Sequence, residues 1–181
     1  TKFDNGTIEI HYQLFPIQDL AFRTILMFES RLEKRNITLE GLDSEPVQVW
    51  GDPDLIGQVI YNLFENATKF VNTGGTITFT FKDEPNSTSI AIRNTGAGIS
   101  KEELPKIFER FYKSDDSRSH DKTGLGIGLD ITKHIVRLHK AQISVSSEEG
   151  EYTEFLIRLP KKDAPAESPT ENPEKQPKDA R

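Results

Sequence analysis

One stretch organises the chain: residues 58–70, which read QVIYNLFENATKF. Just ahead of it, Asp52 and Pro53 form a good helix start, because a carboxylate caps the free N–H groups and proline suits the first helical position. At about 100° per residue, the apolar side chains around this stretch form one continuous arc, which predicts a helix with a core-facing side. The members of that arc are Ile56, Val59, Ile60, Leu63, Phe64, Ala67, Phe70 and Val71.

Polar side chains border this arc instead of lying opposite it. Asn62 and Asn66 are four residues apart and therefore line up along the helix, and Lys69 follows on the same side. An amide oxygen can bind Mg²⁺, and a lysine beside it can bind phosphate. For the helix alone, solvated polar residues on an ordinary amphipathic helix are the commoner explanation. The choice between the two depends on motifs further along the chain.

Length and composition exclude several classes of protein. The chain has 181 residues, which suffices for one domain with a real core. Its net charge is -6, and no basic run with interleaved aromatic residues occurs, so we expect no nucleic-acid partner. The absence of cysteine excludes disulfides and thiolate metal sites. No apolar run approaches the ~20 residues that a membrane-spanning helix needs, so we expect no direct membrane contact of this chain.

The pattern of elements predicts an α+β fold. Alternation predicts strands over 7–12, 77–81 and 90–92, and short strands over 37–39, 47–50, 143–145 and 155–159. Helical spacing follows Pro16 and recurs around Ile131 and Ile135. Neighbouring strands pair as hairpins, so we expect a two-layer α/β sandwich with a mixed, mostly antiparallel sheet on about three helices. We assign residues 1–6 to a lead-in, 7–160 to the domain and 161–181, which are rich in Pro, Glu and Lys, to a disordered tail.

Two glycine motifs follow the central helix. The first, NTGAGI at residues 94–99, comes at the end of a predicted strand, where glycines let the backbone approach a flat ligand closely. The second, GLGIGL at residues 124–129, leads into a helix and presents free N–H groups to an anion. Each motif alone is explained equally well by a simple turn or loop. The polar stretch 113–123 between them is long for a structureless connection, and loops of that length are usually functional lids or disordered.

Taken in order, these motifs form a specific signature. The chain resembles the ATP-binding catalytic domain of bacterial sensor histidine kinases, in the superfamily that includes gyrase, Hsp90 and MutL. Residues 62–70 look like the N box, 94–99 and 124–129 like the two glycine boxes, and 108–112, FERFY, like the F box. The resemblance covers about residues 7–160 and implies a Bergerat-type α/β sandwich with an ATP lid.

The resemblance also implies roles for individual residues. Asn66, helped by Asn62, would hold Mg²⁺ at the ATP phosphates, and these two residues with Lys69 would form the catalytic set. Asn94 would face the adenine amino group, and Lys113 and Arg118 would reach the γ-phosphate from the lid. The residues expected to bind ATP are Phe70, Asn94, Gly96, Gly98, Ile99, Tyr112, Lys113, Arg118, Gly124, Leu125, Gly126, Ile127, Gly128 and Leu129.

Two residues depart from the family pattern. The first glycine box usually begins with Asp, and here Asn94 stands in its place. An uncharged acceptor makes a weaker hydrogen bond than a carboxylate, so we expect a weaker adenine contact. The N box usually ends in Tyr, and Phe70 lacks the hydroxyl group. Both changes weaken the expected site without removing it.

The expected reaction is phosphoryl transfer. Hydrolytic members of the superfamily carry a Glu at the position of Asn62, and an amide cannot act as the general base for water. Transfer to a histidine on a separate dimerisation domain of a homodimer therefore fits better, followed by transfer to a response regulator. Residues 1–6 resemble the end of the dimerisation helix, and the resemblance implies a cytoplasmic part of a bacterial membrane receptor. The histidines of this chain lack the acceptor context, and we interpret them as strand, lid or helix-surface residues: His11, His120, His134 and His139.

Two other functions remain open at this point. One is a phosphotransferase of the same superfamily that phosphorylates a serine of a regulatory protein, against which the kinase-like lead-in argues. The other is a nucleotide-binding interaction module that has lost transfer activity, as Asn94 and Phe70 suggest. The presence of Asn66, Lys69 and the lid glycines argues against that second alternative.

Overall fold

The computed structural model describes residues 8–105 and 128–164. Three helices and seven strands are assigned within these ranges. They follow the chain in the order β1 (Gln13–Pro16), α1 (Ile17–Lys34), β2 (Thr38–Glu40), β3 (Gln48–Gly51), α2 (Pro53–Phe70), β4 (Thr76–Asp83), β5 (Ser87–Thr95), α4 (Gly128–Leu138), β6 (Gln142–Glu148) and β7 (Tyr152–Pro160).

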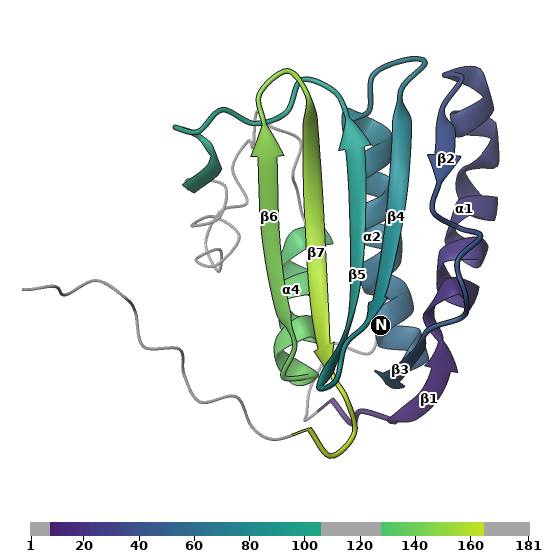
Figure 1. Ribbon diagram of the computed structural model, residues 1–181, viewed down its shortest axis with the longest axis vertical. Helices are drawn as coiled ribbons and strands as arrows, with labels where there is room; N and C mark the ends of the chain where they lie inside the picture. Colours follow the sequence, from purple (N-terminus) through teal and green to yellow (C-terminus); the bar gives the residue numbers. More distant parts are fainter. Residues whose placement is uncertain (1–7, 106–127, 165–181) are drawn as a thin grey trace, which may run out of the picture.

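Five strands form one mixed sheet in the order β2-β4-β5-β7-β6. The β2–β4 pair is parallel, and the other three pairs are antiparallel. In Figure 1, α2 and α4 lie behind this sheet, and α1 lies at its β2 edge. The predicted α+β sandwich with a mixed, mostly antiparallel sheet is therefore confirmed, and so are both predicted hairpins.

The strand predicted over residues 7–12 is wrong. Residues 8–12 form no strand, and β1 begins only at Gln13, which lies opposite Gly51 of β3 in a separate two-stranded sheet. A residue before Gln13 would face Asp52, where the chain already turns into α2. The backbone of residues 8–12 therefore has no neighbouring strand with which to form a β ladder, although their side chains alternate.

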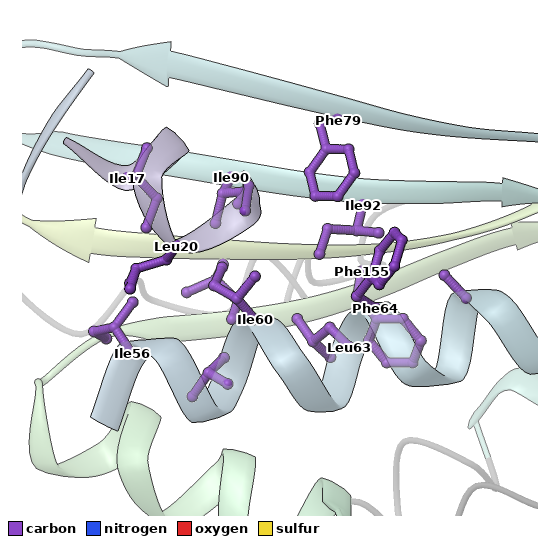
Figure 2. Packing of buried hydrophobic residues seen from close by; sticks show 14 of the residues in the cluster. Ile17, Leu20, Ile56, Ile60, Leu63, Phe64, Phe79, Ile90, Ile92 and Phe155 are labelled. Carbon is purple, nitrogen blue, oxygen red and sulfur yellow. The ribbon is translucent and has the colours of Figure 1, made fainter. Parts of the chain in front are cut away.

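The central helix begins where the sequence predicts. The Asp52 carboxylate accepts hydrogen bonds from the N–H groups of Asp54 and Leu55, and Pro53 occupies the first helical position. In Figure 2, the apolar side chains of α2, among them Ile60, Leu63 and Phe64, point toward the strands and belong to one buried cluster with Ile90, Ile92 and Phe155. The rings of Phe64 and Phe79 stack with centroids 5.6 Å apart.

One member of the predicted apolar arc is not in the core. Phe70 is 38% exposed, whereas Val71, the next residue, is 1% exposed. The helix ends at Phe70, and Val71 has extended backbone angles (φ -62°, ψ 137°), so the chain turns and Val71 enters the core. The projection from a regular helix therefore fails for Phe70, the last helical residue, where the chain leaves the helix so that Val71 and not Phe70 is buried.

Other local predictions fall at the edges of the described ranges. After the first glycine motif, the Ser100 Oγ accepts a hydrogen bond from the Glu103 N–H at 3.2 Å, as an N-cap residue does. The tail assigned to 161–181 lies outside the described residues from position 165 onward, so that boundary stays a prediction. None of the helices in residues 8–105 and 128–164 has both the length and the apolar character needed to cross a membrane.

Candidate functional site

Helix α2 places two amides side by side at the border of the core. Asn62 and Asn66 are 9% and 7% exposed, one helical turn apart. The Asn62 amide nitrogen donates to the Thr132 hydroxyl of α4 at 3.4 Å. The Asn66 amide makes no hydrogen bond within the described part of the chain. The polar atoms of Asn66 are not among the fully buried ones that lack a partner, so this amide at the border of the core is available for contact with a ligand.

Lys69 lies near the end of α2, as predicted. Its ammonium nitrogen is 3.9 Å from the Glu65 carboxylate, one turn back, and the two side chains are 47% and 34% exposed. An ion pair as exposed as this holds its lysine weakly. Lys69 can therefore exchange Glu65 for a phosphate oxygen at little cost.

Asn94 lies on β5 and points toward the helical layer. It shares a sheet face with the buried residues Ile90 and Ile92 and is itself 4% exposed. Its amide nitrogen donates to the Thr95 carbonyl oxygen at 3.0 Å. This bond leaves the amide oxygen of Asn94 as the acceptor that a ligand can use.

The first glycine motif is held by backbone contacts on two sides. At Gly96 (φ 152°) a Cβ would lie 2.4 Å from the Phe70 carbonyl oxygen, at the end of α2. At Gly98 (φ 66°) it would lie 2.2 Å from the Glu148 carbonyl oxygen, at the end of β6. A side chain at either position would collide with backbone, so the fold itself demands glycine here, and these contacts bring Asn94 near the end of α2.

The second glycine motif reaches the described structure only at its end. Gly128 is the first residue of α4, Leu129 is buried, and Thr132 is fully buried one turn later. The other residues predicted for the F box, the lid and this motif lie outside the described residues. They are Tyr112, Lys113, Arg118, Gly124, Leu125, Gly126 and Ile127.

The interpretation of His139 as a surface residue is wrong. Its side chain is 2% exposed, directly after the end of α4. Its Nε2 accepts a hydrogen bond from the Asp52 N–H at 3.1 Å, and its Nδ1 donates to the Ile135 carbonyl oxygen at 2.8 Å. Burial lowers the pKa of His139 below its ordinary value, although the Ile135 carbonyl and the Asp52 charge oppose that shift. His134 is exposed on α4, and His11 is exposed outside any strand.

Sequence reasoning also missed Thr132, which contacts Asn62. A buried threonine in an amphipathic helix gives no signal of its own, and its partner lies 70 residues away. The described residues contain no cluster of three or more His, Cys, Asp or Glu side chains that could hold a metal.

A comparison with protein families matches residues 51–163 to a family described as histidine kinase-, DNA gyrase B-, and HSP90-like ATPase. Among curated proteins, the sensor protein SrrB of Staphylococcus aureus is 40% identical over 161 residues. That alignment covers 88% of this chain but only 27% of SrrB, so the chain spans about a quarter of the length of the curated relatives it matches.

Solved structures of histidine kinases have the same fold. The catalytic domain of histidine kinase ThkA matches with a TM-score of 0.67 and 27% identity, over 83% of this chain and 97% of that domain. A second ThkA structure, in complex with the response regulator protein TrrA, matches with a TM-score of 0.68 and 26% identity, over 84% of this chain and 42% of that one.

Proposed function

The chain belongs to the family of histidine kinase-, DNA gyrase B- and HSP90-like ATPases, as the ATP-binding catalytic domain of a sensor histidine kinase, and on that premise we propose how it acts. It binds ATP together with Mg²⁺ at the face shared by α2, α4 and the end of β5. There it presents the γ-phosphoryl group to a histidine on a separate dimerisation domain. The resemblance stated from the sequence agrees with the family match.

The position of the Asn66 amide, at the border of the core, carries this proposal. It lies beside Asn62, near the exposed Lys69, and has no hydrogen-bond partner within residues 8–105 and 128–164. Amide oxygens suit Mg²⁺, which keeps several waters and completes its coordination with phosphate oxygens. Bound Mg²⁺ would neutralise charge on the phosphates, while Lys69 contacts a phosphate oxygen from the same end of the helix.

Asn94 would orient the adenine. Its amide nitrogen is held by the Thr95 carbonyl, so its free oxygen can accept a hydrogen bond from the adenine amino group. The hydrogen bond between two neutral groups is weaker than one to a carboxylate. We therefore propose a site with the usual adenine specificity and a reduced adenine contribution to affinity.

Asn62 favours transfer over hydrolysis. Its side chain cannot take a proton from water, and its amide nitrogen is engaged with the Thr132 hydroxyl. Catalysis in such a site consists mainly of positioning and charge neutralisation, which serves any acceptor that is brought to the γ-phosphate. Serine of a regulatory protein is a second possible acceptor, but SrrB and ThkA are both named as sensor or histidine kinases.

We place the acceptor histidine on the separate dimerisation domain, and of the histidines of this chain His120 lies outside the described residues. His139 is buried and hydrogen-bonded through both ring nitrogens, and His11 and His134 lie on the surface without the acceptor context. The partners that we propose are the protein's own dimerisation domain, within a homodimer, and a response regulator, since ThkA is seen with TrrA. For the full-length protein we propose a bacterial membrane receptor with this domain on the cytoplasmic side.

Calorimetric titration with a non-hydrolysable ATP analogue tests the site. We expect Mg²⁺-dependent binding by the wild type and loss of the Mg²⁺-dependent part in Asn66→Ala. Asn86→Ala, in the exposed turn between β4 and β5, is the matched control and should bind like the wild type. Unchanged affinity in Asn66→Ala would refute the Mg²⁺ assignment. Absence of binding at millimolar nucleotide in the wild type would favour an interaction module that has lost the site.

A further inference from the structure

Helices α2 and α4 run in opposite directions and are joined by two polar bridges, one at the middle of α2 and one at its start. Near the proposed nucleotide site, the Asn62 amide contacts the Thr132 hydroxyl. At the start of α2, the N–H of Asp52, its cap, donates to His139, which directly follows α4. Thr132 and His139 are seven residues apart along the chain, a span of about 10 Å at 1.5 Å per residue.

The hydrogen bonds of His139 determine its protonation state. Nε2 accepts from a backbone N–H and therefore carries no proton, whereas Nδ1 faces a carbonyl oxygen and must carry one. The imidazole is thus neutral and in a single tautomer. A Cβ on Gly51 would lie 3.3 Å from the His139 ring, so the ring fits closely against β3.

Residues 8–12, which precede β1 and are called the entry segment here, also contact Asp52 and His139. The N–H of His11 donates to Asp52 Oδ2 at 3.0 Å, while Asp52 Oδ1 caps α2. The Tyr12 ring lies edge-on to the His139 ring, with centroids 5.6 Å apart, and stacks on Trp50 at 5.4 Å. One carboxylate and one imidazole therefore connect the entry segment, the start of α2 and the end of α4.

We propose that His139 is a positioning residue that couples the entry segment to the nucleotide site through α4. The proposal rests on the proposed function and adds a route for its regulation. A displacement of residues 8–12 changes the contacts of Tyr12 and Asp52 with His139, and α4 moves as a rigid element that begins at Gly128 and contacts Asn62 through Thr132. Such a coupling is reciprocal, so nucleotide binding must also alter the environment of Tyr12 and Trp50.

Trp50 is the only tryptophan of the chain and makes this coupling measurable. Its emission is recorded while the non-hydrolysable ATP analogue is added with Mg²⁺, and affinity is measured separately by calorimetry. We expect the emission of Trp50 to change during the titration, with the same midpoint concentration as the calorimetric titration. In His139→Leu, which removes both hydrogen bonds, we expect affinity to fall by about five- to tenfold, within the range typical of coupled sites, and the emission change to disappear.

Two further variants separate coupling from folding. The amide of His139→Gln offers one hydrogen-bond acceptor and one donor. Its nucleotide affinity and its change in Trp50 emission should therefore be close to those of the wild type. Tyr12 is 39% exposed, so Tyr12→Ala should fold normally even if His139→Leu does not. We expect it to weaken binding by about threefold or more, with no further loss when both changes are combined.

The possible failures are distinguishable. The coupling would be overturned if the wild type bound nucleotide in calorimetry without any change in Trp50 emission, and if Tyr12→Ala and His139→Leu bound with wild-type affinity. That result would leave the proposed function intact. Absence of calorimetric binding by the folded wild type would overturn the proposed function and this inference with it.

Discussion

Replacing Asn94 by aspartate turns a buried hydrogen-bond donor into a charged acceptor, and we expect this to tighten ATP binding while weakening the fold. In the wild type, the amide nitrogen donates to the Thr95 carbonyl oxygen at 3.0 Å, and the side chain is 4% exposed. A carboxylate there loses that donor and places a negative charge beside a carbonyl oxygen. Only a ligand that donates a hydrogen bond, such as the adenine amino group, compensates the charge.

The two effects have different magnitudes. Leaving a buried polar group without its partner costs about 1–3 kcal/mol, which is the expected loss in the free energy of unfolding without nucleotide. A hydrogen bond to a charged group contributes about 1 kcal/mol more than a neutral one, which corresponds to about fivefold tighter ATP binding. An inosine nucleotide, with a carbonyl in place of the amino group, should bind more weakly to Asn94→Asp than to the wild type.

Two measurements are needed, urea denaturation without nucleotide and calorimetry with the adenosine and inosine analogues. Asn86→Asp, in the exposed β4–β5 turn, controls for the added charge and should change neither result. If Asn94→Asp lost stability but kept the wild-type ratio of adenosine to inosine affinity, the Asn94 side chain would not face the adenine amino group, and the argument would fail.

Two more predictions concern stability. Phe64 is fully buried against the rings of Phe28 and Phe79, so Phe64→Ala should lower the free energy of unfolding by about 3–5 kcal/mol. Urea denaturation measures this, and a loss as small as that of Phe22→Ala, whose side chain is 46% exposed, would contradict it. Burial lowers the pKa of His139, so below the unfolded value of about 6.5 the unfolded chain binds a proton that the folded chain does not. The contribution of His139 to the free energy of unfolding should therefore be fully present above this pH and be lost as the pH drops below it. Thermal melts at about pH 7.5 and about pH 5.5 measure this, and the melting temperature should fall more for the wild type than for His139→Gln. An equal fall for both proteins would contradict the prediction.

Local signals predicted most of the fold. Asp52 and Pro53 place the start of α2, apolar spacing identifies its buried side, and alternation identifies the β4–β5 hairpin, because each pattern depends on neighbours in the chain. The same reasoning placed Asn62 and Asn66 together at the border of the core. The family resemblance is confirmed, while the roles of individual site residues stay predictions.

The errors share a physical cause. Residues 8–12 alternate like a strand, but their would-be partner is a helix cap, and Phe70 follows the apolar spacing of a helix that ends there. His139 follows the last turn of α4, and its partner Asp52 is 87 residues away. Contacts over such separations depend on the packing of whole elements, which periodicity along the chain does not encode.

The backbone oxygens beside Gly96 and Gly98 bear on how relatives of this domain are classified. Any side chain at these positions would strike the carbonyl of Phe70 or Glu148 in this structure. A relative that had lost its catalytic activity would therefore still keep both glycines, simply to fold. The first glycine motif is evidence of ancestry, and a survey that sorts active members from inactive ones should instead compare the position of Asn66, for which no hydrogen bond within the described residues gives a structural reason.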